Sequence, residues 1–520
     1  MRKKVFIICL FFLVNLVQGF SQDKVHSLTF NVSVEDTLKS SFKPEGRLFI
    51  FLTADPEGNP VDKIWPNSYN KKTFIFARNY SSWDINETLK IRDSEGWKSW
   101  GRINNCSFDR IPEGTYYVQI LWQQNFDAFA ISEDENIRSH KQELVLNSSQ
   151  TLEVKLDWLY ESWNAETHSH IKLVKVQSDT LSNWWGKPVY EYAAVLLPSG
   201  YFKNQDVEYP VYYFVGGGDS DCLALLSQMN SKEFADWWMD ENAPQIIIVY
   251  LDGTKNRNIY HLDSDNLGPH GYSLVNELIP CIEKKYRGTD SPDTRFIGGC
   301  STGGYGSLAL QLFYPKTFNG VYCYNPDPIS FTDLMCINIY DDENFFTDEF
   351  GYPTMLNHLG RTSNPISFRD WAELENVLGR SGTYLDSDHV LGVWFNIFGP
   401  KGNNGLPAPL VDPLTGTIDH KVAESWSRYD LTKYIADNWD RIGPDLQGKI
   451  NISCNVTDSY FTDRAVRVFE STLNKLENPK PEAVIEWTPG MSHCNYYFGR
   501  PTHKPVLDKI EEKLRQMITK

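Results

Sequence analysis

The segment FIGGCSTGGYGSLAL, residues 296–310, decides how the rest of this sequence is interpreted. Within it, GCSTG (residues 299–303) fits the pattern G-x-S-x-G, in which a serine occupies a sharp turn between a strand and a helix. The pattern alone is weak, because glycine-rich turns are common. Here RFIG precedes it and reads as a strand, and GYGSLALQLF follows and reads as a helix. The sequence therefore predicts that Ser301 is a catalytic nucleophile, with a purely structural turn as the alternative.

Strand-like and helix-like segments alternate on both sides of this turn, as in a sheet of mainly parallel strands. The expected strands are 190–201, 209–218, 244–254, 293–300, 317–328, 448–455 and 482–487, and the expected helices are 271–287, 303–315, 463–476 and a terminal helix with Leu507, Ile510, Leu514 and Met517 on its apolar face. A long aromatic-rich insertion at 329–446 interrupts the alternation, and it is too long for a loop. We predict an α/β catalytic domain over 186–520 in which this insertion contains helices that form a lid before the catalytic acid.

The region before residue 160 has a different character. Short segments rich in β-branched and aromatic residues, such as SLTFNVSV and GTYYVQILW, are separated by turn clusters such as DPEGNP. This pattern is typical of a β-sandwich. We predict an N-terminal β-sandwich domain at 23–160 and a linker at 161–185. A carbohydrate-binding role and a packing or lid role are both open for this domain.

The first 21 residues resemble a secretory signal peptide. A basic start precedes an apolar stretch of roughly 13 residues, which is too short to cross a membrane, and small residues fit a cleavage site after Ser21. Cys9 lies inside the apolar stretch and lacks the context of a lipoprotein cleavage site. We therefore expect an exported chain, secreted or periplasmic, with no membrane anchor.

The composition argues against several classes of partner and cofactor. The 520-residue chain has a formal net charge of −17, which disfavours nucleic acid and anionic membrane surfaces as partners. It contains no dinucleotide-binding or phosphate-binding glycine loop, and His168 and His170 are more typical of a surface pair than of a metal site. We therefore expect neither a metal nor a cofactor.

Backbone donors for an oxyanion are expected at two places. The helix that begins after Ser301 offers no partner for the N–H of Thr302, so this N–H can face the reacting oxygen. The second donor is expected in YFVGGG, where Gly217 and Gly218 let the chain turn its N–H groups toward the site. A plain turn is the alternative for these glycines.

The base and the orienting acid should follow the serine in the order acid, then histidine. His493 follows the expected strand AVIEW and a Pro-Gly turn, and His503 is its near rival. The other histidines after the serine fall within the insertion, at 358, 389 and 420. Asp458 follows one strand and precedes a helix, whereas Asp463 fits the first turn of that helix better. We predict a triad in which Asp458 orients His493 and His493 takes the proton of Ser301.

Four segments of the sequence resemble a known family. YPVYYFVGGG, QIIIVYLDGT, GGCSTGGYGSLALQLFYPKTFNGVY and NVTDSYFTDRAVRVF are similar to the putative-esterase branch of the α/β-hydrolases, which includes feruloyl and acetyl xylan esterases, esterase D and enterochelin esterase-like proteins. The resemblance covers roughly residues 186–328 and 446–500. Family members often have His-Gly-Gly where this chain has three glycines at 216–218, and backbone donors survive that change.

A second, local resemblance concerns two cysteines. GCSTGG and PGMSHC look like the tannase and fungal feruloyl esterase family, in which a disulfide joins the neighbours of the catalytic serine and histidine. The resemblance implies a Cys300–Cys494 disulfide, and two unrelated thiols are the alternative. The sequence does not determine how the remaining cysteines pair, at 106, 222, 281, 323, 336 and 454.

Together these features predict an exported serine ester hydrolase that acts through an acyl-enzyme on Ser301. By the resemblance, its substrates would be feruloyl or acetyl esters of plant-type polysaccharides. An acyltransferase using the same serine is the alternative among enzymes. A carbohydrate-binding protein with a degenerate hydrolase domain is the alternative outside them.

Overall fold

The computed structural model describes residues 26–64, 73–92, 96–101, 107–126, 134–161, 168–218, 220–358, 365–489, 493–494 and 503–518. The chain divides into two compact units, one of Met1–Trp122 and Ile137–Trp158, the other of Gln123–Asn136 and Leu159–Lys520. The signal peptide expected at 1–21 lies outside the described residues. No helix in the described ranges combines the length and the apolar character that a membrane crossing needs.

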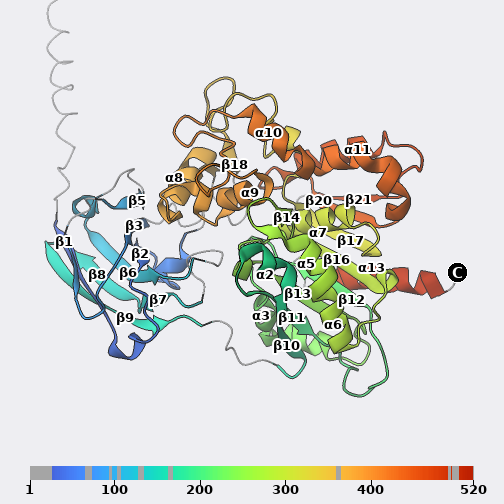
Figure 1. Cartoon of the computed structure of the whole chain (residues 1–520), viewed down its shortest axis with the longest axis horizontal. Coiled ribbons are helices and arrows are strands. Elements are labelled where there is room, and N and C mark those ends of the chain that lie inside the picture. Colours follow the sequence, from blue (N-terminus) through green and yellow to red (C-terminus); the bar gives the residue numbers. More distant parts are fainter. Residues whose placement is uncertain are drawn as a thin grey trace, which may run out of the picture. The chain divides into compact units, whose positions relative to one another are not determined.

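The first unit is built on nine strands that are coloured blue to cyan in Figure 1. They are β1 (Leu28–Val34), β2 (Gly46–Thr53), β3 (Phe74–Tyr80), β4 (Leu89–Ile91), β5 (Lys98–Gly101), β6 (Gly114–Gln123), β7 (Ile137–Ser139), β8 (Gln142–Leu146) and β9 (Gln150–Leu159). Hydrogen bonds link them into one sheet in the order β4-β1-β9-β7-β6-β2-β3-β5, with β8 paired to β6. Burial alternates along β1, whereas every residue of β2 is buried. The β-rich character is as expected, and the stacking into a sandwich stays a prediction.

The second unit contains an eight-stranded mixed sheet in the order β10-β11-β13-β12-β16-β17-β20-β21. Its strands are β10 (Ile171–Ser178), β11 (Val189–Leu196), β12 (Val211–Val215), β13 (Ile247–Asp252), β16 (Arg295–Ser301), β17 (Gly320–Pro326), β20 (Ile450–Asn455) and β21 (Val484–Thr488). All neighbours from β13 to β21 pair in parallel, and β11 is antiparallel to both β10 and β13. This is the α/β sheet that the alternating pattern indicates, and it agrees with the α/β-hydrolase fold that the resemblance implies.

The catalytic sheet begins earlier than the sequence predicted. Residues 161–185 were expected to be a linker, yet β10 pairs with β11 along its whole length and α2 (Asp179–Trp185) follows it directly. Ile171 and Val174 are buried by this pairing. An edge strand joined antiparallel to its neighbour lacks the strand–helix–strand rhythm by which the other strands were found, so the pattern missed it.

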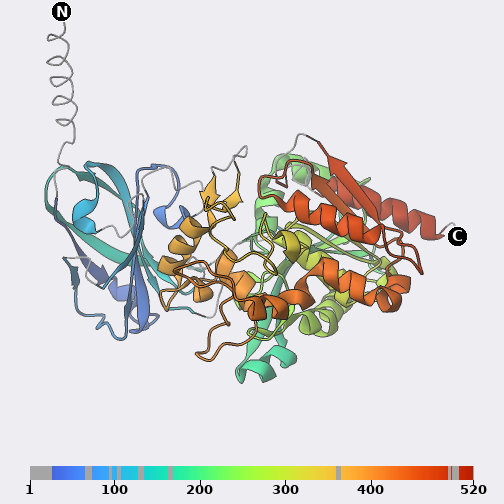
Figure 2. The same cartoon turned by 90° about the horizontal axis from the view of Figure 1, so that it is seen from above.

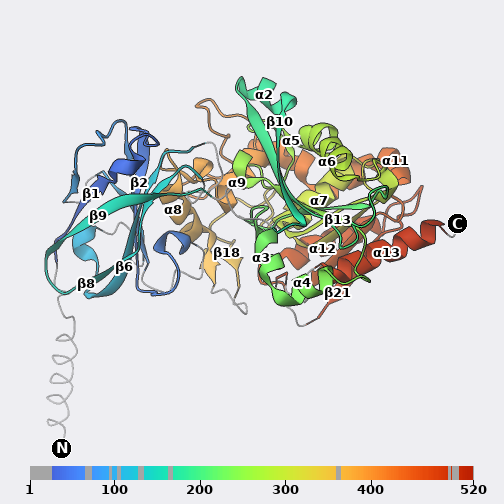
Figure 3. The ribbon, with the colours of Figure 1, turned by 90° about the horizontal axis from the view of Figure 1, so that it is seen from below.

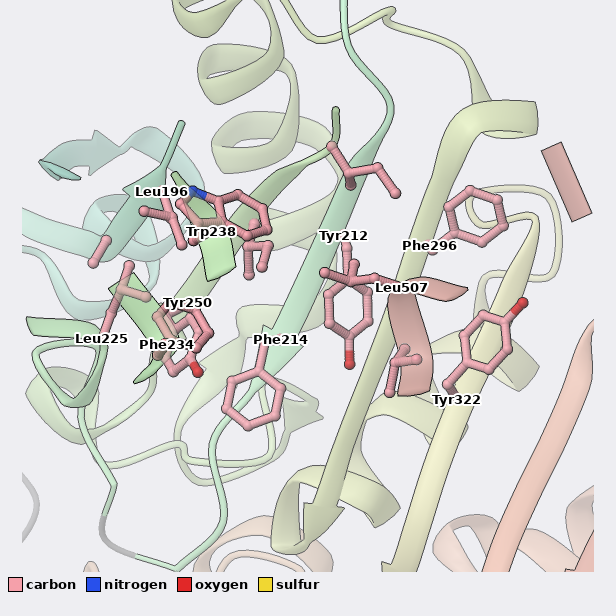
Figure 4. Packing of buried hydrophobic residues seen from close by; sticks show 14 of the residues in the cluster. Leu196, Tyr212, Phe214, Leu225, Phe234, Trp238, Tyr250, Phe296, Tyr322 and Leu507 are labelled. Atoms are coloured by element: carbon pink, nitrogen blue, oxygen red, sulfur yellow. The ribbon is translucent and has the colours of Figure 1, made fainter. Parts of the chain in front are cut away.

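Helices cover both faces of this sheet. One face carries α3 (Ala224–Asn230), α4 (Lys232–Trp238) and α13 (Lys504–Ile518), of which α4 and α13 lie on the same side in Figure 3. Figure 4 shows their apolar side chains packed against Tyr212, Phe214 and Tyr250 of the sheet. On the other face the Tyr213 hydroxyl donates to Glu283 of α6 (Ile279–Tyr286) at 3.1 Å. Because successive side chains of a strand point to opposite faces of the sheet, the two faces pack against different helices.

The insertion at 329–446 contains helices, as expected. They are α8 (Phe368–Leu378), α9 (Val390–Phe398), α10 (His420–Trp426) and α11 (Leu431–Ile442), and a short strand pair of β18 (Met355–Asn357) and β19 (Ile366–Ser367) accompanies them. These segments are yellow to orange in Figure 2. Trp371 and Trp426 are fully buried within the insertion, so its aromatic content serves packing at these positions. The lid role stays a prediction.

Candidate active site

The serine turn has the geometry that the glycine pattern requires. Ser301 ends β16, and α7 (Thr302–Phe313) begins at the next residue. Its backbone has φ 59° and ψ −125°, a conformation that a non-glycine residue adopts only under strain. A Cβ at Gly303 would lie 2.0 Å from the carbonyl oxygen of Val215 on β12, so only glycine allows the helix to pass this close. The packing of strand against helix therefore holds the strained serine in place.

His493 and Asp458 form a hydrogen-bonded pair. Asp458 follows β20, is 1% exposed, and accepts a hydrogen bond at 2.7 Å from Nδ1 of His493. The Asn325 amide donates to the same carboxylate oxygen at 2.7 Å, and the N–H of Tyr460 donates to the other at 2.8 Å. These bonds compensate the burial of a carboxylate and fix its direction.

The two groups shift each other's protonation. Burial alone would raise the pKa of Asp458, but the charge and hydrogen bond of His493 leave that pKa below its usual value. Burial alone would lower the pKa of His493, but the charge of Asp458, its hydrogen bond and the charge of Asp327 raise that pKa above its usual value. The imidazolium is thus the stabilised form, which suits a group that must hold a proton during a reaction.

The Ser301 hydroxyl has a partner that the sequence did not predict. It donates to Oδ1 of Asp327 at 3.1 Å, while Oδ2 of Asp327 accepts from the Thr302 hydroxyl at 3.0 Å. Among the hydrogen bonds of the described residues, none joins Ser301 to His493. Asp327 directly follows β17, the strand beside β16, so its place after a neighbouring strand was the signal that could have identified it.

Ser301 and His493 nevertheless line one cavity of 350 Å³. Its walls include Phe214, Tyr250, Tyr460 and the Cys300–Cys494 pair, which makes much of the lining aromatic or apolar. The side-chain oxygen Oε1 of Gln228, which also lines the cavity, is buried and has no hydrogen-bond partner. The cavity thus combines the candidate nucleophile with a hydrophobic wall and a buried acceptor.

The expected oxyanion donors lie beside this cavity. Gly217 and Gly218 line it, and Gly218 has a φ of 58°. A Cβ at Gly217 would lie 2.9 Å from the carbonyl oxygen of Cys300, so a side chain there would press on the nucleophile turn. Thr302 is the first residue of α7, where backbone N–H groups lack helical partners. Their role as oxyanion donors stays a prediction.

The rival candidates from the sequence lie elsewhere. His503 is fully buried against Tyr250 and Phe214, and burial lowers its pKa to about 3. Asp463 lies in the first turn of α12 (Thr462–Leu473), 3.6 Å from Nε of Arg467. His358 of the insertion contacts the Asp458 loop, with Nε2 2.9 Å from the Asp458 carbonyl oxygen. None of the three is bonded to the Ser301 hydroxyl in the described part of the chain.

Cys300 and Cys494 form a disulfide with a Cα–Cα distance of 6.1 Å, as the resemblance implied. It joins the residue before Ser301 to the residue after His493, and both sulfurs belong to the buried core under α13. The free cysteines of the described ranges are Cys222, Cys281, Cys323, Cys336 and Cys454, while Cys106 lies outside those ranges. The disulfide therefore ties together the two segments that carry the candidate nucleophile and base.

The rings of His168 and His170 lie near each other in a tilted arrangement, with centroids 5.5 Å apart. Across the residues with described positions, no group of three or more His, Cys, Asp or Glu side chains is arranged to hold a metal ion.

Comparison with known proteins identifies the central segment of the chain. Residues 192–348 match the family model described as "Putative esterase". An uncharacterized protein of Corynebacterium glutamicum is 25% identical over 151 residues, a match that spans 28% of this chain and 34% of that protein. This chain thus aligns with about a third of that relative.

The chain is similar to solved structures that include a ferulic acid esterase and an S-formylglutathione hydrolase. A ferulic acid esterase is 17% identical, with a TM-score of 0.39, and the match covers 66% of this chain and 97% of that one. An S-formylglutathione hydrolase from Agrobacterium tumefaciens is 12% identical, with a TM-score of 0.38, and the match covers 68% of this chain and 97% of the other. Likeness at this level carries no inference about the substrate of the present chain.

Proposed function

We propose that the chain is a serine hydrolase with Ser301, His493 and Asp458 as its triad, and the match of residues 192–348 to the family model described as "Putative esterase" supports this proposal. The observation that carries the proposal is the His493–Asp458 hydrogen bond at 2.7 Å beside a strained serine in the same cavity. An acid after β20, a base after β21 and a nucleophile at the end of β16 supply the groups that acyl transfer through a covalent intermediate needs.

The chemistry follows from these groups. The Ser301 oxygen attacks the ester carbonyl while its proton passes to Nε2 of His493, and Asp458 stabilises the resulting imidazolium. The carbonyl oxygen, now negative, receives hydrogen bonds from the N–H of Thr302 and from the Gly217–Gly218 turn. His493 then gives the proton to the departing alcohol, which leaves an acyl-enzyme. Water repeats the sequence and releases the carboxylic acid and the free serine.

We propose that the acyl group is aromatic, and that a feruloyl ester of a plant-type polysaccharide is the preferred substrate over an acetyl ester. The cavity of 350 Å³ has Phe214 and Tyr250 on its wall, and these rings suit a planar aromatic acid. The buried, unpartnered Oε1 of Gln228 offers an acceptor for a phenolic hydroxyl. An acetyl group would leave both features unused.

Hydrolysis of p-nitrophenyl acetate and of methyl ferulate by the purified chain tests this function. We expect turnover of both, a higher kcat/KM for methyl ferulate, and a loss of about 10⁴-fold or more in Ser301→Ala. Ser425→Ala, in α10 of the insertion, is the matched control and should retain activity. Full activity in Ser301→Ala would overturn the proposal, and transfer to an added alcohol in preference to water would point to an acyltransferase.

We further propose that the chain is exported and loses residues 1–21. The leader-like first segment and a disulfide beside the active site support this, since disulfides persist in oxidising compartments. Sequencing of the N-terminus of the mature protein, with Gln22 as the expected first residue, is the test. A mature protein that retains the apolar segment would contradict it.

A further inference from the structure

We propose that Asp327 is a second carboxylate of the reacting site, which accepts the hydrogen bond of the Ser301 hydroxyl in the free enzyme and titrates together with His493. The inference rests on the proposed function only where activity is the readout. Asp327 lies outside the predicted triad, and it contacts the reacting oxygen directly at 3.1 Å.

The backbone holds Asp327 in register with the nucleophile. The N–H of Asp327 donates to the carbonyl oxygen of Ser301 at 3.0 Å, just past the point where β16 and β17 shift register between Cys300 and Ser301. The shift pairs Ser301 with Pro326, the residue before Asp327. The irregularity in the strand pair therefore aims a carboxylate at the serine turn.

Hydroxyl groups surround the Asp327 carboxylate. Ser301 donates to one oxygen, while Thr302 and Tyr260 donate to the other, and the indole N–H of Trp394 donates to the Tyr260 oxygen at 2.8 Å. Hydrogen bonds from several hydroxyls compensate a carboxylate for the loss of water on burial, so it needs no cation in direct contact. The residue is 8% exposed, so solvent contributes little to this compensation.

The titratable groups that interact with Asp327 come from four places in the chain. They are Tyr260 after β13, Tyr305 on α7, Tyr460 after β20 and His493 after β21. Burial raises the pKa of Asp327, and the Tyr260 hydrogen bond, the His493 charge and the two smaller hydroxyl bonds oppose that rise. The charge of Asp327 in turn helps to raise the pKa of His493, after Asp458.

Because each group favours the charged form of the other, the pair titrates as a unit. In the proposed arrangement Asp327, which accepts from three hydroxyls, is the anion, and the last proton to leave the pair is on His493. The Asp327 anion then places the pKa of His493 above that of the same imidazole beside an uncharged residue. Removing the charge at 327 should therefore lower the pKa that the imidazole reports.

This arrangement also assigns a step before attack. The Ser301 hydroxyl points to Asp327 in the free site, so it must turn to Nε2 of His493 before its proton can pass to the imidazole. The hydrogen bond from Ser301 to Asp327 is lost in this turn, and the Oγ–H bond of Ser301 then breaks as an N–H bond forms at Nε2 of His493. The hydrogen bond from Thr302 to Asp327 stays in place. Asp327 is thus an acceptor that competes with the base for the same hydroxyl.

A direct titration tests the proposal independently of activity. The imidazole signal of His493, identified by its loss in His493→Asn, is followed by NMR over pH in the full mature chain and in Asp327→Asn. We expect the midpoint to fall by at least about 0.5 pH unit in Asp327→Asn. The acid limb of kcat/KM should move to lower pH by the same amount.

Tyr260→Phe is the matched variant, because it removes a donor to Asp327 and keeps the charge. It should leave the His493 midpoint unchanged or raise it. An unchanged midpoint in folded Asp327→Asn, or a fall in Tyr260→Phe as large as in Asp327→Asn, would overturn the proposal. If Asp327→Asn does not fold, Asp327→Ser takes its place with the same expectation. A shifted midpoint in a chain that hydrolyses no ester would leave this inference standing and reject the proposed function.

Discussion

His493 and His503 are ten positions apart in the chain, and both were candidates for the base, yet the fold places them in opposite environments. His493 has Asp458 at 2.7 Å, a second carboxylate nearby and a side chain that is 14% exposed at the cavity. His503 is fully buried among the rings of Tyr212, Phe214 and Tyr250, and its Nε2 is hydrogen-bonded to the Tyr250 hydroxyl.

The difference shows that burial and basicity are separate properties. Burial of His503 lowers its pKa to about 3, so its ring is neutral at physiological pH and Nε2 can accept from Tyr250. Burial also opposes the charge on His493, but there two carboxylates outweigh it and its pKa is raised. A buried histidine becomes a usable base only where a carboxylate repays the desolvation of its cation.

The largest expected effect separates the two histidines by catalysis. His493→Asn should lower kcat by about 10⁵-fold or more, because the hydroxyl loses its proton acceptor. His503→Asn should retain kcat within about tenfold, since His503 lies in the core beneath the site. Initial rates on methyl ferulate at pH 7.5, measured on samples with matched folded fractions, check this. Comparable losses of kcat in the two variants would contradict the assignment of His493, and not His503, as the base.

A smaller loss is expected when the acid of His493 is neutralised. Asp458→Asn should lower kcat by about 10⁴-fold, because Asn at this position favours the wrong imidazole tautomer. Asp463→Asn is the matched control and should change kcat by less than about threefold, since Asp463 pairs with Arg467 on the surface of α12. The same rate assay applies. If Asp463→Asn caused the large loss of kcat and Asp458→Asn the small one, Asp463 would be the acid.

The two histidines should also change the free energy of unfolding in opposite directions as the pH rises. The pKa of folded His503 is about 3, below its unfolded value near 6.5, so the stability it contributes is present above pH 6.5 and is lost as pH falls toward 3. His493, with a raised pKa, contributes stability below its unfolded pKa that is lost as pH rises through the folded pKa.

Urea unfolding of His503→Asn between pH 6 and pH 4 tests this. The dependence of the unfolding free energy on pH should weaken by about 1.4 kcal/mol per pH unit relative to the parent chain. His261 and His270, whose pKa values burial lowers to about 3 and about 4, should keep a residual slope of the same sign. An identical slope in parent and variant would contradict the low pKa of His503.

The smallest expected effect concerns Gln228, which lines the same cavity as Ser301 and His493. Gln228→Leu should lower kcat/KM for methyl ferulate about tenfold relative to methyl cinnamate, which lacks the phenolic hydroxyl. Gln447→Leu, on the loop before β20 and remote from the cavity, is the control. Competition between the two esters measures the ratio directly. An unchanged ratio would mean that Gln228 does not read the hydroxyl.

Much of the candidate site was predictable because its determinants are local. The serine turn needs glycines at fixed offsets between a strand and a helix, and those offsets are visible in GCSTG. His493 and Asp458 each follow a strand in the required chain order, and the strand pattern made both positions recognisable. The cysteine pair was found through the resemblance of its two local motifs.

The sequence alone was enough to predict the alternation of strands and helices after β10, the strand–turn–helix at Ser301 and the positions of Asp458 and His493 after their strands, because each of these features depends on near neighbours in the chain. Only the tertiary structure decided that β10 joins the sheet, that His503 enters the core, and that Asp327 meets the Ser301 hydroxyl. Those outcomes depend on which strands lie side by side. The order β12-β16-β17-β20 brings together residues from 217 to 458 that no local pattern relates.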